Sequence, residues 1–165
     1  MSIPYLPEIL INNMLFMDYS TLTAFCSTNS IIHSICQDDY FWKLKIEHDF
    51  GMLTQYKPEA ISYRQQYKDL MNTKDPNQAA MDDRIDLLMN LGIKNLYPDQ
   101  YGANYSALYG QLEVLKWLAF TRNLYPNQDG VNYAAKYGYL EVLKWLASTR
   151  NLYPDQDGAN GAADY

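Results

Sequence analysis

Residues 112–132 read LEVLKWLAFTRNLYPNQDGVN, and residues 140–160 read LEVLKWLASTRNLYPDQDGAN. The tetrapeptide NLYP begins at Asn95, Asn123 and Asn151, which sets a period of 28 residues. Between the two full copies, 21 of 28 positions are identical. A repeat of this length is typical of arrays in which each copy buries its apolar face against the next. We therefore predict a stacked array of repeated units.

Each copy predicts a short helix followed by a longer one. The segment LEVLKWLA places Leu140, Leu143 and Leu146 on one helical face. The preceding VNYAAKYG predicts a shorter helix that turns its alanines inward and ends at Gly138. The Asp-Gly dipeptide at 129–130 predicts a turn. The proline of NLYP is expected to end the longer helix, because the residue before a proline is disfavoured in the α conformation.

The first 50 residues carry no repeat and predict three short helices. Pro7 is suited to the start of the first helix, and Ser20 is the expected N-cap of the second. The third covers IIHSIC and leads into an aromatic cluster at 40–42. Three short helices make a marginal core, so we expect this unit to gain stability by packing on the array or on a partner.

The expected fold is all-α and in three parts. A small three-helix unit spans residues 1–50, and a helical linker spans 51–80, with the boundary in the polar loop 72–78. The repeat array spans 81–165 and contains a half-unit, two full units and a last unit that stops before its LEVLKWL segment.

Composition excludes several classes of function. The chain has 165 residues, is 48% hydrophobic and carries a net charge of −6. An acidic surface repels phosphate backbones, so nucleic acid is not the expected partner. Apolar runs fall short of the roughly 20 residues that span a membrane, and MSIPYLPEIL lacks a secretory signal pattern. With two cysteines and no disulfide framework, the chain is expected to be intracellular and cytoplasmic.

Residues suited to catalysis or metal binding are few. The cysteines Cys26 and Cys36 and the histidines His33 and His48 have the spacing of no structural zinc site. The sequence DQDG resembles part of a calcium loop, but it places Tyr153 at the first ligand position. We therefore expect no cofactor, no metal and no enzymatic activity. The remaining enzyme hypothesis uses His33 or Cys26 as base or nucleophile.

The repeat resembles the ankyrin repeat. The similarity rests on DG at 129–130, AAxxG at 134–138 and LEVLKWL at 140–146. The unit departs from the ankyrin pattern because it lacks TPLH and has 28 residues rather than about 33. The resemblance implies paired helices whose turns and short helices present a concave face to a protein partner.

The N-terminal segment resembles the F-box motif. The similar residues are LPEIL at 6–10, then Leu22, then Phe25 and Cys26, then DDYFW at 38–42. Large DNA viruses encode many chains that join such a module to ankyrin-like repeats, and the Asn-, Tyr- and Ile-rich composition is similar to theirs. The resemblance implies docking on a Skp1-like adaptor of a cullin ubiquitin ligase. The repeats would then hold the protein to be ubiquitinated.

Two sets of site residues follow from these patterns. The docking surface implied by the F-box resemblance comprises apolar residues: Leu6, Pro7, Ile9, Leu10, Met14, Leu22 and Phe25. Positions that differ between the two full copies are free of the demands of stacking and supply a target-binding patch. That patch comprises Tyr101, Leu108, Gln111, Lys136 and Tyr139.

A second hypothesis keeps the array but has no link to a ligase. In it, the N-terminal helices merely cap the solenoid, and the protein acts as a scaffold or decoy. Under both hypotheses the chain is a monomer apart from its protein partners.

Overall fold

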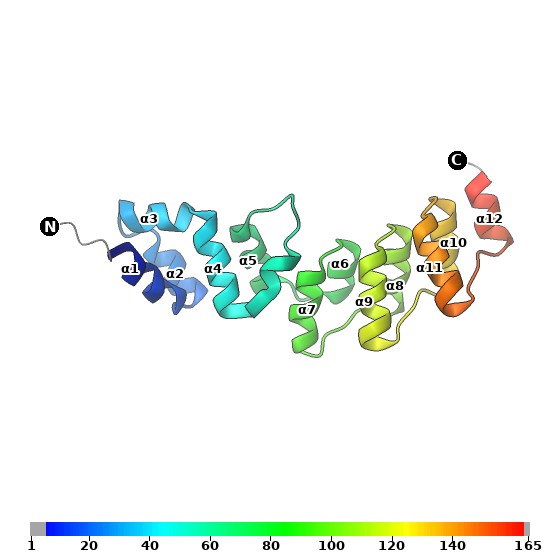
Figure 1. The fold of residues 1–165 in the computed structure, drawn as a ribbon, viewed down its shortest axis with the longest axis horizontal. Coiled ribbons are helices and arrows are strands. Elements are labelled where there is room, and N and C mark those ends of the chain that lie inside the picture. The colour runs from blue at the N-terminus through cyan, green and yellow to red at the C-terminus, as the bar shows by residue number, and fades with distance from the viewer. Residues whose placement is uncertain (1–5, 164–165) are drawn as a thin grey trace. The chain divides into compact units, whose positions relative to one another are not determined.

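A computed structural model describes residues 6–163, with side chains from residue 8 to residue 161. Throughout this range the chain is α-helical and forms no strand, which confirms the all-α prediction. It divides into two units, Met1–Asn72 and Thr73–Tyr165, each with its own internal contacts (Figure 1). Within the described part, no helix has the length and apolar character that crossing a membrane requires.

The first unit contains more helices than the three predicted. Its elements are α1 (Leu6–Leu15), α2 (Tyr19–Phe25), α3 (Ser30–Gln37), α4 (Asp39–Phe50), the 3-10 helix η1 (Gly51–Tyr56) and α5 (Tyr63–Asn72). The predicted third helix, at residues 31–36, lies within α3. The aromatic cluster lies on a further helix, α4, which begins where the Asp38 carboxylate accepts a hydrogen bond from the Tyr40 amide. The N-cap of α2 is Asp18, which accepts from the Thr21 amide at 2.9 Å, and not Ser20.

Aromatic and aliphatic side chains form the core of the first unit. Trp42 and Tyr67 are almost fully buried, with ring centroids 5.3 Å apart, and Phe41 packs edge-on against Trp42. Tyr40, the third aromatic of the predicted cluster, is 62% exposed. Tyr67 lies on α5, which packs on α4 as η1 does. Residues 51–72 are therefore part of this unit and not a separate linker.

A buried lysine joins α1 to α4. The Lys45 ammonium donates to the carbonyls of Leu15 and Met17, at 2.6 and 2.8 Å, and to the Asp49 carboxylate at 3.0 Å. The Tyr67 hydroxyl donates to the same carboxylate at 2.6 Å. Burial raises the pKa of Asp49, but hydrogen bonds from Tyr67, His48 and Lys45 outweigh it and hold the pKa below its usual 3.8. The charge of Lys45 is thus paired and fully hydrogen-bonded.

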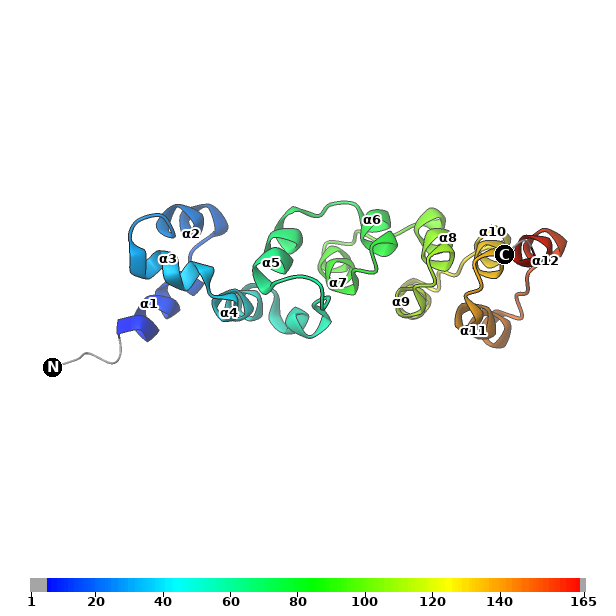
Figure 2. The same ribbon diagram turned by 90° about the horizontal axis from the view of Figure 1, so that it is seen from above.

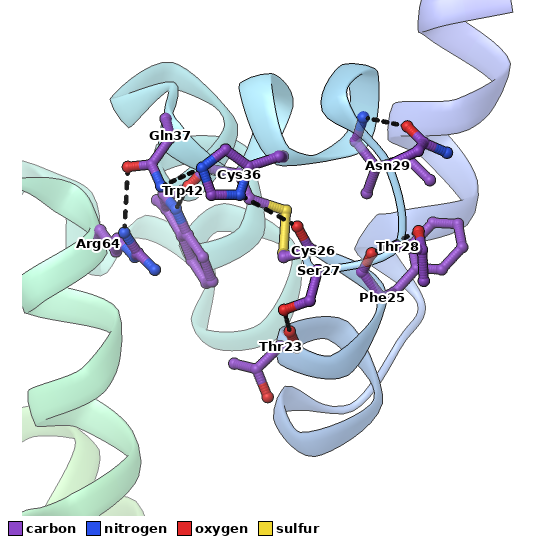
Figure 3. Close-up of a disulfide and its surroundings, with 12 residues drawn as sticks. Thr23, Phe25, Cys26, Ser27, Thr28, Asn29, Cys36, Gln37, Trp42 and Arg64 are labelled. Atoms are coloured by element: carbon purple, nitrogen blue, oxygen red, sulfur yellow. Dashed lines mark hydrogen bonds between the residues drawn. A yellow bond between two sulfur atoms is a disulfide. The ribbon is translucent and has the colours of Figure 1, made fainter.

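Cys26 and Cys36 form a disulfide between the end of α2 and α3, with Cα atoms 5.8 Å apart (Figure 3). The sequence was taken to hold no disulfide framework, and this one bond was not predicted. Spacing alone did not reveal the bond, because two helices must pack together before cysteines ten residues apart can meet. The Trp42 indole donates to the Cys36 carbonyl at 2.8 Å, so the disulfide is anchored to the aromatic core.

The second unit is built of helix pairs in two layers. Its helices are α6 (Pro76–Met81), α7 (Ile85–Ile93), α8 (Gln100–Leu108), α9 (Leu112–Arg122), α10 (Gln128–Lys136), α11 (Leu140–Arg150) and α12 (Gln156–Ala163). The short helices α6, α8, α10 and α12 form one layer, and α7, α9 and α11 form the other (Figure 2). The predicted half-unit is a full pair, because α6 supplies its short helix, so the repeats begin before residue 81.

Asparagines, rather than the predicted signals, set the start of α10 and the end of α11. Asn127 begins α10 by accepting from the amides of Asp129 and Gly130, so the predicted Asp-Gly turn lies inside the helix. Asn151 ends α11 in the left-handed conformation with φ 53°, and its amide donates to the Ala147 carbonyl. The helix therefore stops three residues before Pro154 through an asparagine C-cap, and the proline is not the cause.

Close contacts between the short helices hold the layer together. A Cβ added at Gly130 would lie 2.6 Å from the Pro126 side chain and 2.9 Å from Asn104 Oδ1. Asn104 Oδ1 in turn accepts from the Asn127 amide at 3.0 Å, and Asn77 and Asn132 make the equivalent bonds in their own pairs. Between the layers, the loop tyrosines stack on the next long helix, as Tyr125 does on Trp145 at 5.7 Å.

Candidate protein-binding surfaces

A row of tyrosines covers one side of the short-helix layer. Tyr101, Tyr105 and Tyr109 follow one another at every fourth residue of α8 and its C-cap, and Tyr133 and Tyr137 continue the row on α10. Residues four apart lie on the same helical face, which places each set in line. We call these five residues the tyrosine face.

The tyrosine face is accessible and locally ordered. Tyr101, Tyr109 and Tyr137 are each about half exposed. The rings of Tyr101 and Tyr105 lie 4.2 Å apart, and those of Tyr105 and Tyr109 lie 6.3 Å apart. A hydrogen bond with Tyr105 raises the pKa of Tyr101 above its usual 10.0. The three rings of α8 and its C-cap brace one another, so little of their side-chain entropy remains to be lost when a partner binds.

Tyrosine has the right chemistry for binding protein. Its ring offers a large contact area with few rotatable bonds, and its hydroxyl both donates and accepts hydrogen bonds. Tyrosine is accordingly enriched among the residues that contribute most to binding at protein interfaces. At the Tyr137 end, the Lys136 ammonium lies 5.7 Å from the ring centroid and adds a positive charge beside the row.

The structure divides the predicted target-binding patch. Tyr101 and Lys136 are exposed, and Leu108 is half-buried beside them on the short-helix layer. Gln111 instead donates to the Met81 carbonyl, and the ring of Tyr139 lies against Gly110. Those two residues join neighbouring helix pairs, so their place in an exposed patch is a wrong prediction.

The rest of the tyrosine face was missed because it is repeated. Tyr105 and Tyr133 are equivalent and identical, as are Tyr109 and Tyr137. We attributed identical positions to stacking, but these side chains point away from the stack. The signal present in the sequence was the spacing of four between tyrosines within one copy, at Tyr101, Tyr105 and Tyr109.

The first unit has an apolar groove between α1 and α3. It has a volume of about 370 Å³ and is lined by Ile9, Leu10 and Asn13 from α1 and by Asn29, Ile31 and Ile32 from α3. Ile9 and Ile31 are 57% and 63% exposed. Two exposed isoleucines flanking one groove form an apolar surface of the kind that receives a partner's side chains.

The predicted docking residues fall into three groups. Ile9 and Leu10 line the groove, and Phe25 is half-buried on α2. Met14 and Leu22 have no exposed surface, so the expectation that Met14 is accessible in the free chain is wrong. The side chains of Leu6 and Pro7 lie outside the described residues.

The cysteines and histidines, the side chains most suited to catalysis or metal binding, make structural contacts instead. Among the described residues, no cluster of three or more His, Cys, Asp or Glu could hold a metal ion. Both cysteine sulfurs belong to the disulfide. The His33 ring contacts the Cys26 carbonyl at 3.3 Å, and His48 pairs with Asp49 at 2.7 Å.

Comparison with models of protein families, with curated proteins and with solved structures found no match to this chain.

Proposed function

We propose that the chain is a protein-interaction adaptor without catalytic activity of its own. The tyrosine face is the observation that carries this proposal. Five tyrosines on adjacent helices form an accessible surface that contributes little to the core, and three of them are held in mutual ring contact. Aromatic side chains of this kind are enriched at protein–protein interfaces.

The proposal assigns one role to each unit. The first unit, with its resemblance to the F-box, docks on a Skp1-like adaptor of a cullin ubiquitin ligase through the groove formed by Ile9, Leu10 and Ile31. The second unit, a solenoid of ankyrin-like helix pairs, holds the recruited protein on the tyrosine face. The supporting facts are the LPEIL and DDYFW similarities and the apolar groove at α1.

A second candidate keeps the tyrosine face but has no ligase link. It is favoured by the burial of Met14 and Leu22, because two residues assigned to docking serve the core of the first unit instead. In that case the protein is a scaffold or decoy that sequesters whatever binds the tyrosine face.

Photo-crosslinking tests the role of the tyrosine face. We expect a crosslinking residue at Tyr133 to capture one or a few specific proteins, because a partner would cover that position. The matched control is Phe120, which is 91% exposed on α9, in the other layer. Replacing Tyr105 and Tyr133 together by Ser should then weaken the affinity for the captured partner at least tenfold, about 1.4 kcal/mol. The same set of proteins captured from both positions would contradict the proposal.

A further inference from the structure

The helix pair α10–α11 ends in a groove that is covered one repeat earlier. The groove has a volume of about 530 Å³. Its walls come from the end of α10, from Leu140 and Leu143 of α11, and from Pro154 and Ala159 at α12. The equivalent surface of the preceding pair, on α8 and α9, is covered by α11. The molecule therefore contains a covered and an uncovered version of the same surface.

Two equivalent glycines show the difference most directly. Gly110 and Gly138 have almost the same backbone conformation, with φ of 71° and 73°. At Gly110, an added Cβ would lie 2.3 Å from the ring of Tyr139. At Gly138, nothing lies within 4 Å. The position above Gly138 is thus shaped to receive an aromatic ring like that of Tyr139, and none of the described residues fills it.

The aliphatic residues around the groove repeat this pattern. Leu115 has no exposed surface, whereas its equivalent Leu143 is only partly buried. Leu112 is half-buried, whereas Leu140 is 63% exposed. Covering these side chains removes apolar surface from water, which stabilises by about 25 cal/mol per Å². The same burial of apolar surface that holds α11 on α9 can therefore hold a further helix on α11.

The covered version also shows what fits. Val142 and Leu146 of α11 share a buried cluster with Ala107 and Leu115, and Tyr139 packs against the edge of that cluster. These three α11 residues have the spacing of one helical face, at positions i, i+3 and i+7. The charged side chains of α11, such as Glu141 and Lys144, pair with each other at 2.7 Å on the solvent side.

We propose that this groove is a docking site for an amphipathic helix of another protein. The helix carries an aromatic residue followed by aliphatic residues three and seven positions later. Its aromatic ring lies over Gly138, and its aliphatic residues cover Leu140 and Leu143. The groove continues the interface between α9 and α11. It shares Tyr137 with the tyrosine face, but it follows from the covered copy of this surface at α8 and α9 and not from the function proposed above.

A synthetic peptide with the sequence of residues 139–152, YLEVLKWLASTRNL, supplies the probe. We expect the whole chain to bind the labelled peptide saturably, with a Kd below about 1 mM in fluorescence anisotropy. In amide NMR spectra, the shifts should concentrate at residues 135–143 and around Ala159. A peptide carrying Tyr139→Ser and Val142→Asp should bind at least tenfold more weakly.

Variants of the chain test the location of the site. Leu140→Glu alters an exposed wall of the groove. It should weaken the affinity for the peptide at least tenfold while leaving the fold intact. Phe120→Glu, the matched change at an exposed apolar residue outside the groove, should leave the affinity unchanged. Absence of saturable binding to the wild-type chain, equal binding of the substituted peptide, or unchanged affinity in Leu140→Glu would each overturn the proposal.

Discussion

Replacing Lys45 by Met is expected to lower the free energy of unfolding of the first unit by about 3–5 kcal/mol, the usual effect of breaking a buried ion pair. The change removes the charge and its three donors but keeps most of the side-chain volume. The carbonyls of Leu15 and Met17 then lose the ammonium that ties the end of α1 to α4. The Asp49 carboxylate loses its cation as well.

Lys43→Met is the matched control. Lys43 lies on the same helix, and its ammonium lies 3.9 Å from Glu47 with both side chains well exposed. Exposed pairs of this kind contribute only about 0.2–1 kcal/mol. Hydrogen exchange of the α4 amides in increasing urea would measure both variants. Similar protection in Lys45→Met and Lys43→Met would contradict the network described for Lys45.

Replacing Gly130 by Ala is expected to destabilise the second unit by about 1–3 kcal/mol, the usual effect of overpacking. Helix propensity alone predicts the opposite sign, since Ala is favoured over Gly inside a helix by about 0.5–1 kcal/mol. The added methyl group would lie 3.2 Å from the Asn104 backbone as well as against Pro126. The Asn104 contact cannot relax without separating α10 from α8, and the Pro126 contact cannot relax without moving the loop that leads into α10.

Gly161→Ala on α12 provides the comparison. Its added Cβ would lie at least 3.2 Å from its neighbours, all atoms of the flexible Lys136 side chain. We expect this variant to be neutral or up to about 1 kcal/mol more stable, as helix propensity alone would have it. Thermal unfolding of the two variants should therefore shift in opposite directions, or at least by clearly different amounts. Stabilisation by Gly130→Ala would show that the short helices do not pack as closely as described.

The sequence was most informative where it repeats. The 28-residue period and the LEVLKWL face predicted paired helices, and the pair α10–α11 matches that prediction. Inward alanines were also predicted, and Ala134 has no exposed surface. On the solvent side of α11, Glu141 and Lys144, three residues apart, pair at 2.7 Å. These features depend on local periodicity, which one copy of the repeat already displays.

Prediction failed where the outcome depended on competing local signals. At residues 127–130, a turn at Asp-Gly competed with an N-cap at Asn127, and the cap prevailed because Gly130 is needed for close approach to α8. In the first unit, the N-cap at Asp38 begins α4, a helix that was not predicted. Choosing between such signals requires knowledge of the tertiary contacts, which cannot be read from the sequence.

The two candidate surfaces were predicted only in part for a related reason. Differences between copies identified Tyr101 and Lys136 but could not identify Tyr105 or Tyr133, which are the same in both copies. In the first unit, the F-box resemblance selected apolar residues without separating those that face solvent, such as Ile9, from those that form the core, such as Met14.

The most direct test of the adaptor proposal is isothermal titration of the purified chain with a purified Skp1-like adaptor. We predict saturable one-to-one binding with a Kd in the micromolar range or tighter. Ile9→Asp, which alters an exposed residue of the α1–α3 groove, should weaken it by about tenfold or more, since burying such a side chain contributes about 1.5–3 kcal/mol. Ile93→Asp, at a residue 79% exposed on α7, should leave it unchanged. No binding by the wild-type chain, or equal binding by Ile9→Asp, would contradict the link to a ubiquitin ligase.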